Sequence, residues 1–405
     1  MNFSRLRIPR ITFWRAVVAV FMILGVYALF VRYTRGLGAS SHMTDLFPWG
    51  LWIGFDLLCG VGLAAGGFTI CAAVYIFNVE RFRPIIRPTI LTSFLGYLLV
   101  ITALLVDLGR PYRIWHALVM WNPHSVMFEV AWCVMLYTTV LALEFSPIVF
   151  EKFKLEGPLK IIHKISIPLV ILGVILSTLH QSSLGSLYLI MPTKLHPLWY
   201  SPILPIFFFV SAVAVGLCMT IFESYLSNRA FKKKLEMDLL ADLGKIAVVV
   251  LAVLLVLKVQ DLQYRHVWRY LFQPTQEAFL YWIEVTMGII VPMVLLMFRK
   301  VRYHSFGLFA SALLVLLGFV MNRLNVSITG MTRGSMTTYF PSFLEIMVTV
   351  MIVSLGFVIF SQASRFFPIF ADSKEPVGTA SELPVPEADR SESFANRPSY
   401  ARSRH

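Results

Sequence analysis

Two stretches of this sequence repeat each other: Val106–Trp115 reads VDLGRPYRIW, and Val259–Trp268 reads VQDLQYRHVW. Each ends a long apolar run with an aspartate, an arginine and a tryptophan, and Asp107 and Asp261 hold the matching acidic positions. Duplicated helical segments in a membrane chain point to a site between or within the two copies. The repeat therefore predicts a fold built from two similar helical units.

Each copy continues, after a loop, into a short motif that carries a glutamate. In the first motif, MFEV, Glu129 follows Asp107 by 22 residues, and in the second, WIEV, Glu284 follows Asp261 by 23. A carboxylate inside hydrocarbon is costly unless it is paired or hydrated. These four acids are therefore candidate functional residues.

The composition is that of a protein embedded in a membrane. Of the 405 residues, 58% are hydrophobic and 14% are charged, which excludes an ordinary soluble domain. Ten apolar runs reach or approach the ~20 residues that a membrane-spanning helix needs. They lie at 13–33, 49–77, 89–107, 125–149, 165–188, 198–226, 239–259, 277–298, 305–324 and 341–363. We therefore predict an all-α integral membrane protein with about ten transmembrane helices.

The repeat extends beyond its acidic motifs. Leu179–Gly185 (LHQSSLG) and Leu324–Gly330 (LNVSITG) share the pattern L-x-x-S-x-x-G at the ends of the fifth and ninth runs. Because the copies are offset by four spans, they run parallel and are not inverted. We predict two parallel four-helix bundles with flanking segments. The bundles lie at 47–190 and 196–330, and the flanks are the N-terminus with the first helix (1–33), the tenth helix (339–365) and a disordered cytoplasmic tail (372–405).

The net charge of +13 does not indicate nucleic acid, because the basic residues gather in the connections between spans. The N-terminus and the connections on its side hold 18 Lys and Arg, and the opposite connections hold ten. The positive-inside rule then places both termini in the cytoplasm. The ten residues assigned to the outer side are Arg32, Arg35, Arg110, Arg113, Lys194, Lys258, Arg265, Arg269, Arg323 and Arg333. We expect them to face a partner or the site, or else to be solvated loop ends.

Metal ligands are sparse in this sequence. The four cysteines fall within predicted spans, and no pair has C-x-x-C spacing, so neither an iron–sulfur cluster nor a zinc site is expected. Of the nine histidines, only His180 lies clearly within a span. Two facing axial ligands for a membrane haem are therefore missing, and we predict no metal site in this chain.

Four polar residues of the first bundle are predicted at similar depth near the outer surface. From the helical rise, Asp56 lies roughly 12 Å inside the outer end of the second span, and His180 roughly 10 Å inside that of the fifth. Asp107 closes the third span and Glu129 opens the fourth. Such a layer suits one small molecule with a polar head. The alternatives are structural: an Asp107–Arg110 ion pair, a Glu129 contact with the helix dipole, and hydrogen bonds of His180 to polar neighbours.

The second bundle lacks two of these groups. Asn325 stands where the first copy has His180, and no acid matches Asp56. We therefore place the site in the first bundle and assign Glu284 to a structural echo or a secondary proton route. Glu144, deeper on the fourth span, is a further candidate for such a route, with a carboxylate at a helix end as the alternative.

Longer motifs make the chain similar to a known family. Four of them resemble the NrfD/PsrC family, and two more resemble its HybB-like branch, the membrane subunits of periplasmic nickel–iron hydrogenases and related respiratory complexes. The four are FPWGLWIGFDLLCGVGLAAGG (47–67), NPHSVMFEVAWC (122–133), LALEFSPIVFEKF (141–153) and LHQSSLGSL (179–187); the two are KLHPLWYSPILP (194–205) and YFPSFLEI (339–346). The resemblance covers about residues 15–365.

This resemblance implies a haem-free subunit of the bacterial inner membrane. Such subunits exchange electrons between a periplasmic iron–sulfur partner of the ferredoxin-like type and the membrane quinone, menaquinone or ubiquinone. The catalytic subunits of these complexes are nickel–iron hydrogenases or other oxidoreductases. The family holds quinone in the first four-helix bundle near the periplasmic face, and Asp56, Asp107, Glu129 and His180 match polar positions of its motifs.

Quinone reduction takes two electrons and two protons. The site therefore needs hydrogen-bond donors to the carbonyl oxygens and titratable groups that carry protons. We expect His180 and Arg110 to donate hydrogen bonds to a carbonyl oxygen, Asp107 to share in binding, and Asp56 and Glu129 to pass protons.

Two other interpretations stay open. A secondary transporter or a proton-translocating protein also suits repeats and buried acids, although the matching pair of broken helices typical of transporters is missing. A passive anchor for an iron–sulfur subunit leaves the buried Asp56 poorly explained.

Overall fold

The computed structural model describes residues 12–231 and 236–370. The first eleven residues, Lys232–Lys234 and the predicted cytoplasmic tail at 372–405 lie outside the described residues.

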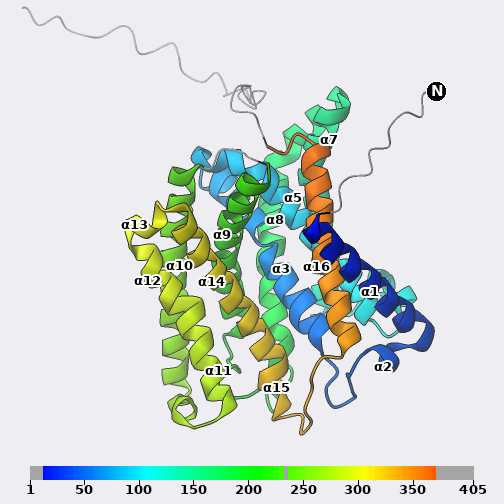
Figure 1. The fold of residues 1–405 in the computed structure, drawn as a ribbon, viewed down its shortest axis with the longest axis vertical. Coiled ribbons are helices and arrows are strands. Elements are labelled where there is room, and N and C mark those ends of the chain that lie inside the picture. The colour runs from blue at the N-terminus through cyan, green and yellow to red at the C-terminus, as the bar shows by residue number, and fades with distance from the viewer. Residues whose placement is uncertain (1–11, 232–235, 371–405) are drawn as a thin grey trace, which may run out of the picture. The chain divides into compact units, whose positions relative to one another are not determined.

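Ten helices are long and apolar enough to cross a membrane, and no strand occurs within the described ranges (Figure 1). This confirms the predicted all-α, multi-pass integral membrane protein. Six spans are single helices: α1 (Phe13–Arg35), α7 (Val126–Phe153), α8 (Glu156–Leu189), α9 (Leu204–Phe231), α10 (Met237–Tyr264) and α16 (Phe343–Phe366).

The other four spans change helix type along their length. The second joins η1 (Trp52–Leu57), α3 (Leu58–Leu63), α4 (Gly66–Cys71) and η2 (Ala72–Ile76), and the third joins η3 (Glu80–Ile85) and α5 (Ile86–Asp107). The eighth joins α11 (Gln276–Val285), η6 (Thr286–Ile290) and α12 (Val291–Met297), and the ninth joins α14 (Ser305–Leu324), η7 (Asn325–Thr329) and α15 (Gly330–Thr332). Short helices in the connections are α2 (Leu37–Ser40), η4 (Pro111–Arg113), α6 (His116–Val119), η5 (Trp268–Phe272) and α13 (Arg299–Arg302).

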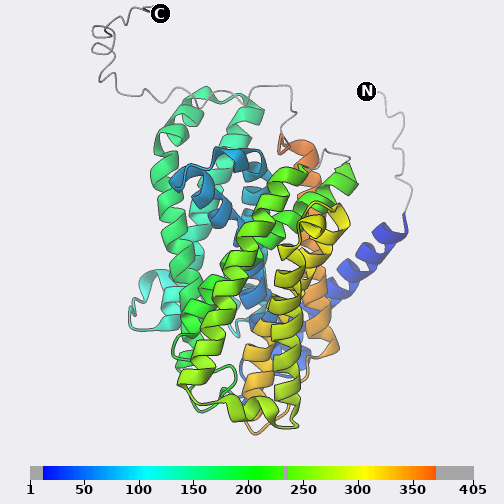
Figure 2. The same ribbon diagram turned by 90° about the vertical axis from the view of Figure 1, so that its left-hand side faces the viewer.

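The helix contacts form two matching rings. In the first ring, α3 and α4 of the second span contact α5, α5 contacts α7, α7 contacts α8, and α8 returns to α4. In the second ring, α9, α10, α12 and α14 contact one another in the same cyclic order. Figure 2 shows the green and yellow helices of the second ring beside α7 and α8 in teal. This pairing fits two parallel bundles, while their limits at 47–190 and 196–330 stay a prediction.

Small residues let the two bundles approach closely. A Cβ added to Gly216 on α9 would lie 2.9 Å from the backbone of Ala65, in the turn between α3 and α4. A Cβ added to Gly185 on α8 would lie 2.7 Å from the Cα of Pro205, at the start of α9. Glycines at such contacts allow backbones in a membrane to meet without a side chain between them.

Helices α1 and α16 flank the first bundle. They pack against each other, and α16 also packs against α5 and η1, on the right-hand side of Figure 1. Trp52 of η1 is buried between α16 and its neighbours, where its indole donates to the carbonyl of Glu345 at 3.3 Å. The tenth span therefore contacts the part of the second span that carries Asp56.

Four short π-helical segments occur in the described part of the spans, and three of them lie beside polar residues. Asp56 lies within Trp52–Leu57, Glu284 comes just before Thr286–Ile290, and Asn325 opens the segment that ends at Thr329. A π-helical turn shifts the helix face by a fraction of a turn and occurs often at functional sites.

Three basic residues that the sequence assigned to outer connections are buried in helices instead. Arg32, Lys258 and Arg323 have relative exposures of 3%, 9% and 1%. The assignment was wrong because each residue lies near the end of an apolar run, where sequence alone does not separate a loop from a buried helix end. Without them the outer connections carry fewer cations, so the charge asymmetry behind the predicted cytoplasmic termini increases.

Replacing Gly288 by alanine is expected to destabilise the second bundle. A Cβ at this position of η6 would lie 2.6 Å from the Cα of Gly318 on α14, and two backbones must then separate. Such overpacking costs about 1–3 kcal/mol. Thermal unfolding of the detergent-solubilised protein measures the change. Gly109→Ala is the control, because nothing lies within 4 Å of its added Cβ; equal unfolding temperatures for both variants would contradict the close contact.

Candidate functional site

The four predicted residues of the first bundle do not form one contact set. Asp56, Asp107, Glu129 and His180 share no hydrogen bond with one another within the described residues, and each has a different environment. His180 lies in the interior of the first bundle, Asp56 and Asp107 lie at its border with α1 and α16, and Glu129 lies nearer the molecular surface.

His180 occupies the interior of the first bundle. Its side chain is fully buried, and its Nδ1 lies 3.0 Å from the hydroxyl of Tyr97 on α5. The Tyr97 ring in turn meets Tyr137 of α7 edge-on, with 4.7 Å between the ring centroids. The other ring nitrogen, Nε2, has no hydrogen-bond partner in the described part of the chain. A buried polar atom left unpaired is costly, so this nitrogen suits an additional partner.

Asp56 faces α16 and not the other predicted residues. Its Oδ2 accepts a hydrogen bond of 2.7 Å from Thr349. Asp107, at the end of α5, is close enough for its charge to act on Asp56. Near it, the Arg32 guanidinium donates to the carbonyls of Val106 and Leu108 at 2.7 Å each. This second polar group therefore lies where the first bundle meets α1 and α16.

Glu129 and Arg110 lie nearer the molecular surface. The Glu129 carboxylate accepts a hydrogen bond of 2.5 Å from Ser183, one turn beyond His180 on α8. Arg110 is exposed. No ion pair joins it to Asp107 among the described residues, and Arg32 is the cation beside that acid. The alternative of an Asp107–Arg110 ion pair is therefore wrong.

Glu144 faces α8 deeper in the first bundle. A Cβ added to Gly173 would lie 3.4 Å from Glu144 Oε1 and 3.7 Å from the ring of Tyr137. The carboxyl group and the Tyr137 ring thus flank the same small residue, on the side of the bundle that also holds His180.

The second bundle contains the larger cluster of buried polar groups, centred on Glu284. Both of its carboxylate oxygens accept two hydrogen bonds, and Lys258 is the charged donor at 2.8 Å. The other donors are Asn322 at 2.7 Å, Trp199 at 2.9 Å and Asn325 at 3.0 Å. A carboxylate has about four acceptor positions, so these four donors saturate Glu284.

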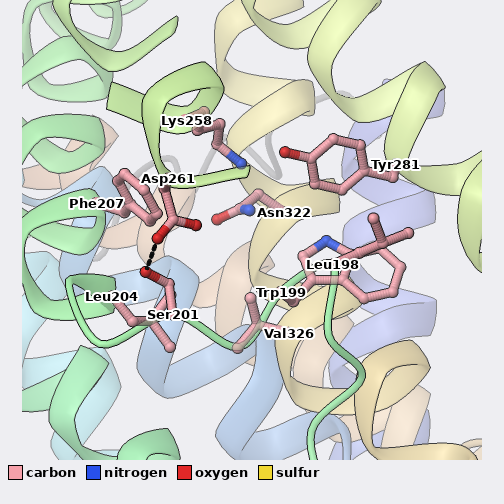
Figure 3. Close-up of a pocket in the computed structure, with 10 residues that line it drawn as sticks. All are labelled: Leu198, Trp199, Ser201, Leu204, Phe207, Lys258, Asp261, Tyr281, Asn322 and Val326. Atoms are coloured by element: carbon pink, nitrogen blue, oxygen red, sulfur yellow. Dashed lines mark hydrogen bonds between the residues drawn. The ribbon is translucent and has the colours of Figure 1, made fainter. Parts of the chain in front are cut away.

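Asp261 is bonded closer to the C-terminal end of α10. Its Oδ1 accepts a hydrogen bond of 2.6 Å from Ser201 (Figure 3), and its Oδ2 accepts from Arg265, whose Nε lies at 2.9 Å. Arg265 also donates to the carbonyl of Pro197 at 2.7 Å. These contacts attach the loop before α9 to the end of α10.

Two small cavities border Lys258. The cavity in Figure 3 has a volume of about 20 Å³ and reaches Asp261 and Ser201, and in this view the Lys258 ammonium points toward Asn322 and Tyr281. A second cavity of about 30 Å³ extends from Lys258 toward Gly288. Each has room for a water molecule.

Arg323 is a fully buried cation between the two bundles. Its guanidinium donates to Ser211 at 2.8 Å and to Asn322 at 2.7 Å, and lies 3.6 Å from the centroid of the Phe208 ring. It forms no hydrogen bond with a carboxylate within the described ranges. Amide, hydroxyl and aromatic groups therefore take the place of a counter-ion.

The sequence comparison of the two copies did not reveal this buried polar cluster in the second bundle. It compared titratable counterparts of His180 and Asp56 and treated Lys258 and Arg323 as loop residues. A signal was present: both cations lie at the ends of the predicted apolar runs 239–259 and 305–324, where a buried charge needs a partner. No sequence signal marked Tyr97, which contacts His180, or Thr349, which contacts Asp56.

Replacing Lys258 by methionine is expected to lower the stability of the protein strongly. The change leaves Glu284 buried without its cation, and breaking a buried pair in this way costs about 3–5 kcal/mol. The double variant Lys258→Met/Glu284→Gln should lose less than the two single variants combined, as measured by thermal unfolding. Lys245→Met is the matched control because Lys245 pairs with Asp242 at the surface, where such pairs contribute about 0–1 kcal/mol. Equal losses for both lysine variants would contradict the assignment.

Comparison with known proteins agrees with this architecture. The family model described as polysulphide reductase, NrfD, matches residues 39–333. A protein of Nitratidesulfovibrio vulgaris (strain Hildenborough) is 40% identical over 365 residues, which cover 87% of this chain and 93% of that protein. The probable Ni/Fe-hydrogenase 2 b-type cytochrome subunit of Escherichia coli K12 is 35% identical over 349 residues, 85% of this chain and 89% of that one. The integral membrane subunit of menaquinone reductase from N. vulgaris is 30% identical over 405 residues, 92% and 95% of the two chains.

The family model thus spans most of the ten-helix core, and the hydrogenase-2 relative confirms the resemblance of the sequence motifs to the HybB-like branch. The protein belongs to the polysulphide reductase NrfD family of integral membrane proteins.

Proposed function

We propose that this protein is the quinone-reactive membrane subunit of a respiratory oxidoreductase, with its quinone site in the first bundle. One observation carries the location: the fully buried His180 is hydrogen-bonded at Nδ1 to Tyr97 and has an unpartnered Nε2. A protonated Nε2 donates a hydrogen bond, which suits a quinone carbonyl oxygen. In the second bundle, by contrast, the buried acid Glu284 is saturated by its own four donors.

The relatives support the class of reaction. One is named as a subunit of menaquinone reductase and another as a subunit of a nickel–iron hydrogenase. We propose menaquinone or ubiquinone as substrate, a periplasmic iron–sulfur subunit as the electron partner, and a hydrogenase or another oxidoreductase as the catalytic subunit. The proposed setting is the bacterial inner membrane with both termini in the cytoplasm.

The reaction needs two electrons and two protons for each quinone reduced to quinol. The iron–sulfur partner supplies or accepts the electrons, and this chain handles the protons. We assign hydrogen bonding of the head group to His180 and Arg110, and proton transfer to Asp56 and Glu129, with Asp107 beside Asp56. Glu129 accepts a hydrogen bond from Ser183 on α8, whereas Asp56 accepts one from Thr349 on α16. The two acids therefore suit proton exchange on different sides of the bundle.

The proposal contains no haem, although the name of the E. coli relative includes a b-type cytochrome. A membrane haem b needs two facing axial ligands. Within the described residues, His180 is the one histidine buried inside a span, and its Nδ1 is bonded to Tyr97. The residues present therefore do not fit a haem held by two histidines.

Glu144 is the better of the two candidates for a proton path toward the cytoplasm. It shares the Gly173 contact with Tyr137, whose ring meets Tyr97, the partner of His180. Glu284, in contrast, has both oxygens occupied by four donors, which suits an anchor more than a carrier. A proton-translocating protein is the second candidate function, and the water-sized cavities beside Lys258 favour it.

Asp56→Asn and His180→Ala are expected to abolish quinone-linked turnover of the assembled complex while leaving assembly intact. The first change removes a proton-carrying group, and the second removes a donor to the head group; a positioned proton donor contributes about 10²–10⁴-fold in rate. Turnover is measured in membranes with a soluble quinone analogue and an artificial electron donor. Glu80→Gln, an exposed acid with 67% side-chain exposure, is the control.

Wild-type quinone reduction in both variants would overturn the assignment of the site. A purified protein without partner subunits and without quinone-linked redox activity would instead favour the proton-translocating alternative.

A further inference from the structure

We infer that the tenth helix is part of the quinone site, and that Thr349 is a positioning residue for Asp56. This inference rests on the proposed function, because it concerns how one of the proposed proton-carrying groups is held. Thr349 and the rest of α16 lie beyond residues 39–333, the range that the family model matches.

Thr349 forms a buried hydrogen bond with the Asp56 carboxyl group. The distance is 2.7 Å, and the two residues are 7% and 5% exposed. Asp56 lies in a π-helical segment of its span, and such segments occur often at functional sites. The contact from α16 therefore fixes the direction in which the Asp56 side chain points.

Glu345 fixes the position of α16 one turn before Thr349. It is fully buried, and its side chain completes a capping box with Ser342, whose N–H donates to Oε2 at 2.7 Å. The backbone N–H of His42 donates to the same oxygen at 3.1 Å. Residues four apart share a face of a helix, so Glu345 and Thr349 both face the first bundle.

Tyr339 connects this cap to the start of the second span. Its hydroxyl donates to Glu345 Oε1 at 2.6 Å and accepts from the backbone N–H of Leu51 at 2.8 Å. The ring stacks on Phe47 with centroids 4.8 Å apart, and a Cβ on Gly50 would lie 2.5 Å from the hydroxyl. Burial, and then the Glu345 carboxylate, raise the pKa of Tyr339, so the hydroxyl keeps the proton that it donates.

These contacts hold the two helices in a fixed register. Tyr339 and Glu345 link the start of α16 to Leu51, five residues before Asp56, and the Trp52 indole adds a bond to the Glu345 carbonyl. Thr349 then meets Asp56 one turn further along both helices. These contacts determine where the Asp56 carboxyl group points, and the proposed proton transfer depends on that direction.

Three variants of the complete complex test the inference. Thr349→Val keeps the shape of the side chain and removes the donor, and it is expected to lower quinone-linked turnover on the order of tenfold, the effect of losing one hydrogen bond to a carboxylate. Thr349→Ser keeps the hydroxyl and is expected to restore most of the rate. Thr102→Val is the matched control, because Thr102 is only half-buried on α5 and its hydroxyl donates to the carbonyl of Leu98 on the same helix.

An infrared measurement separates positioning from packing. In the redox difference spectrum, the carboxyl band that disappears in Asp56→Asn is expected to shift in Thr349→Val and to stay unchanged in Thr102→Val. Wild-type turnover and an unshifted band in Thr349→Val, together with an inactive Asp56→Asn, would overturn the role of Thr349 alone. Wild-type turnover in Asp56→Asn would overturn the proposed site itself.

Discussion

A charge inside hydrocarbon must find partners within the protein, and the helix arrangement follows from how this chain supplies them. Glu284 is surrounded by four donors from three other parts of the chain, Arg32 donates to the last carbonyls of α5, and Glu345 receives donors from two separate loops. Most of these contacts join segments far apart in the sequence. The buried polar groups therefore determine which helices are neighbours, while the apolar surfaces fill the space between them.

The two bundles share one helix order but differ in the hydrogen bonding of Glu284 and His180, one buried titratable group from each. In the second bundle the carboxylate of Glu284 has no acceptor position left, whereas in the first bundle His180 keeps a ring nitrogen without a partner. A saturated cluster is typical of a structural anchor, and an unsaturated buried group is typical of a binding site. The two bundles thus share a helix arrangement, and the groups in their interiors suit different tasks.

Sequence reasoning predicted the ten spans and the parallel repeat, because hydropathy and motif spacing are local properties. It did not predict that Asp56 faces α16, since its partner Thr349 is 293 residues away and a threonine in an apolar run carries no signal. Lys258 and Arg323 were misplaced because a cation near the end of a span looks like a loop residue. The S-x-x-E pattern of Ser342 and Glu345 was readable as a capping box, and it would have marked the start of α16 as a fixed point.

The contact of Arg32 with the end of α5 has a consequence for biogenesis. Helix α1 emerges from the ribosome before α5, and one of the carbonyls that its arginine needs belongs to a residue made 74 residues later. Until the third span is inserted, Arg32 must remain near the lipid head groups or a water-filled exit. We therefore expect α1 to reach its final depth only after α5 has entered the membrane. An apolar residue in place of Arg32 would remove this dependence, and it would also remove the hydrogen bonds to the carbonyls at the end of α5.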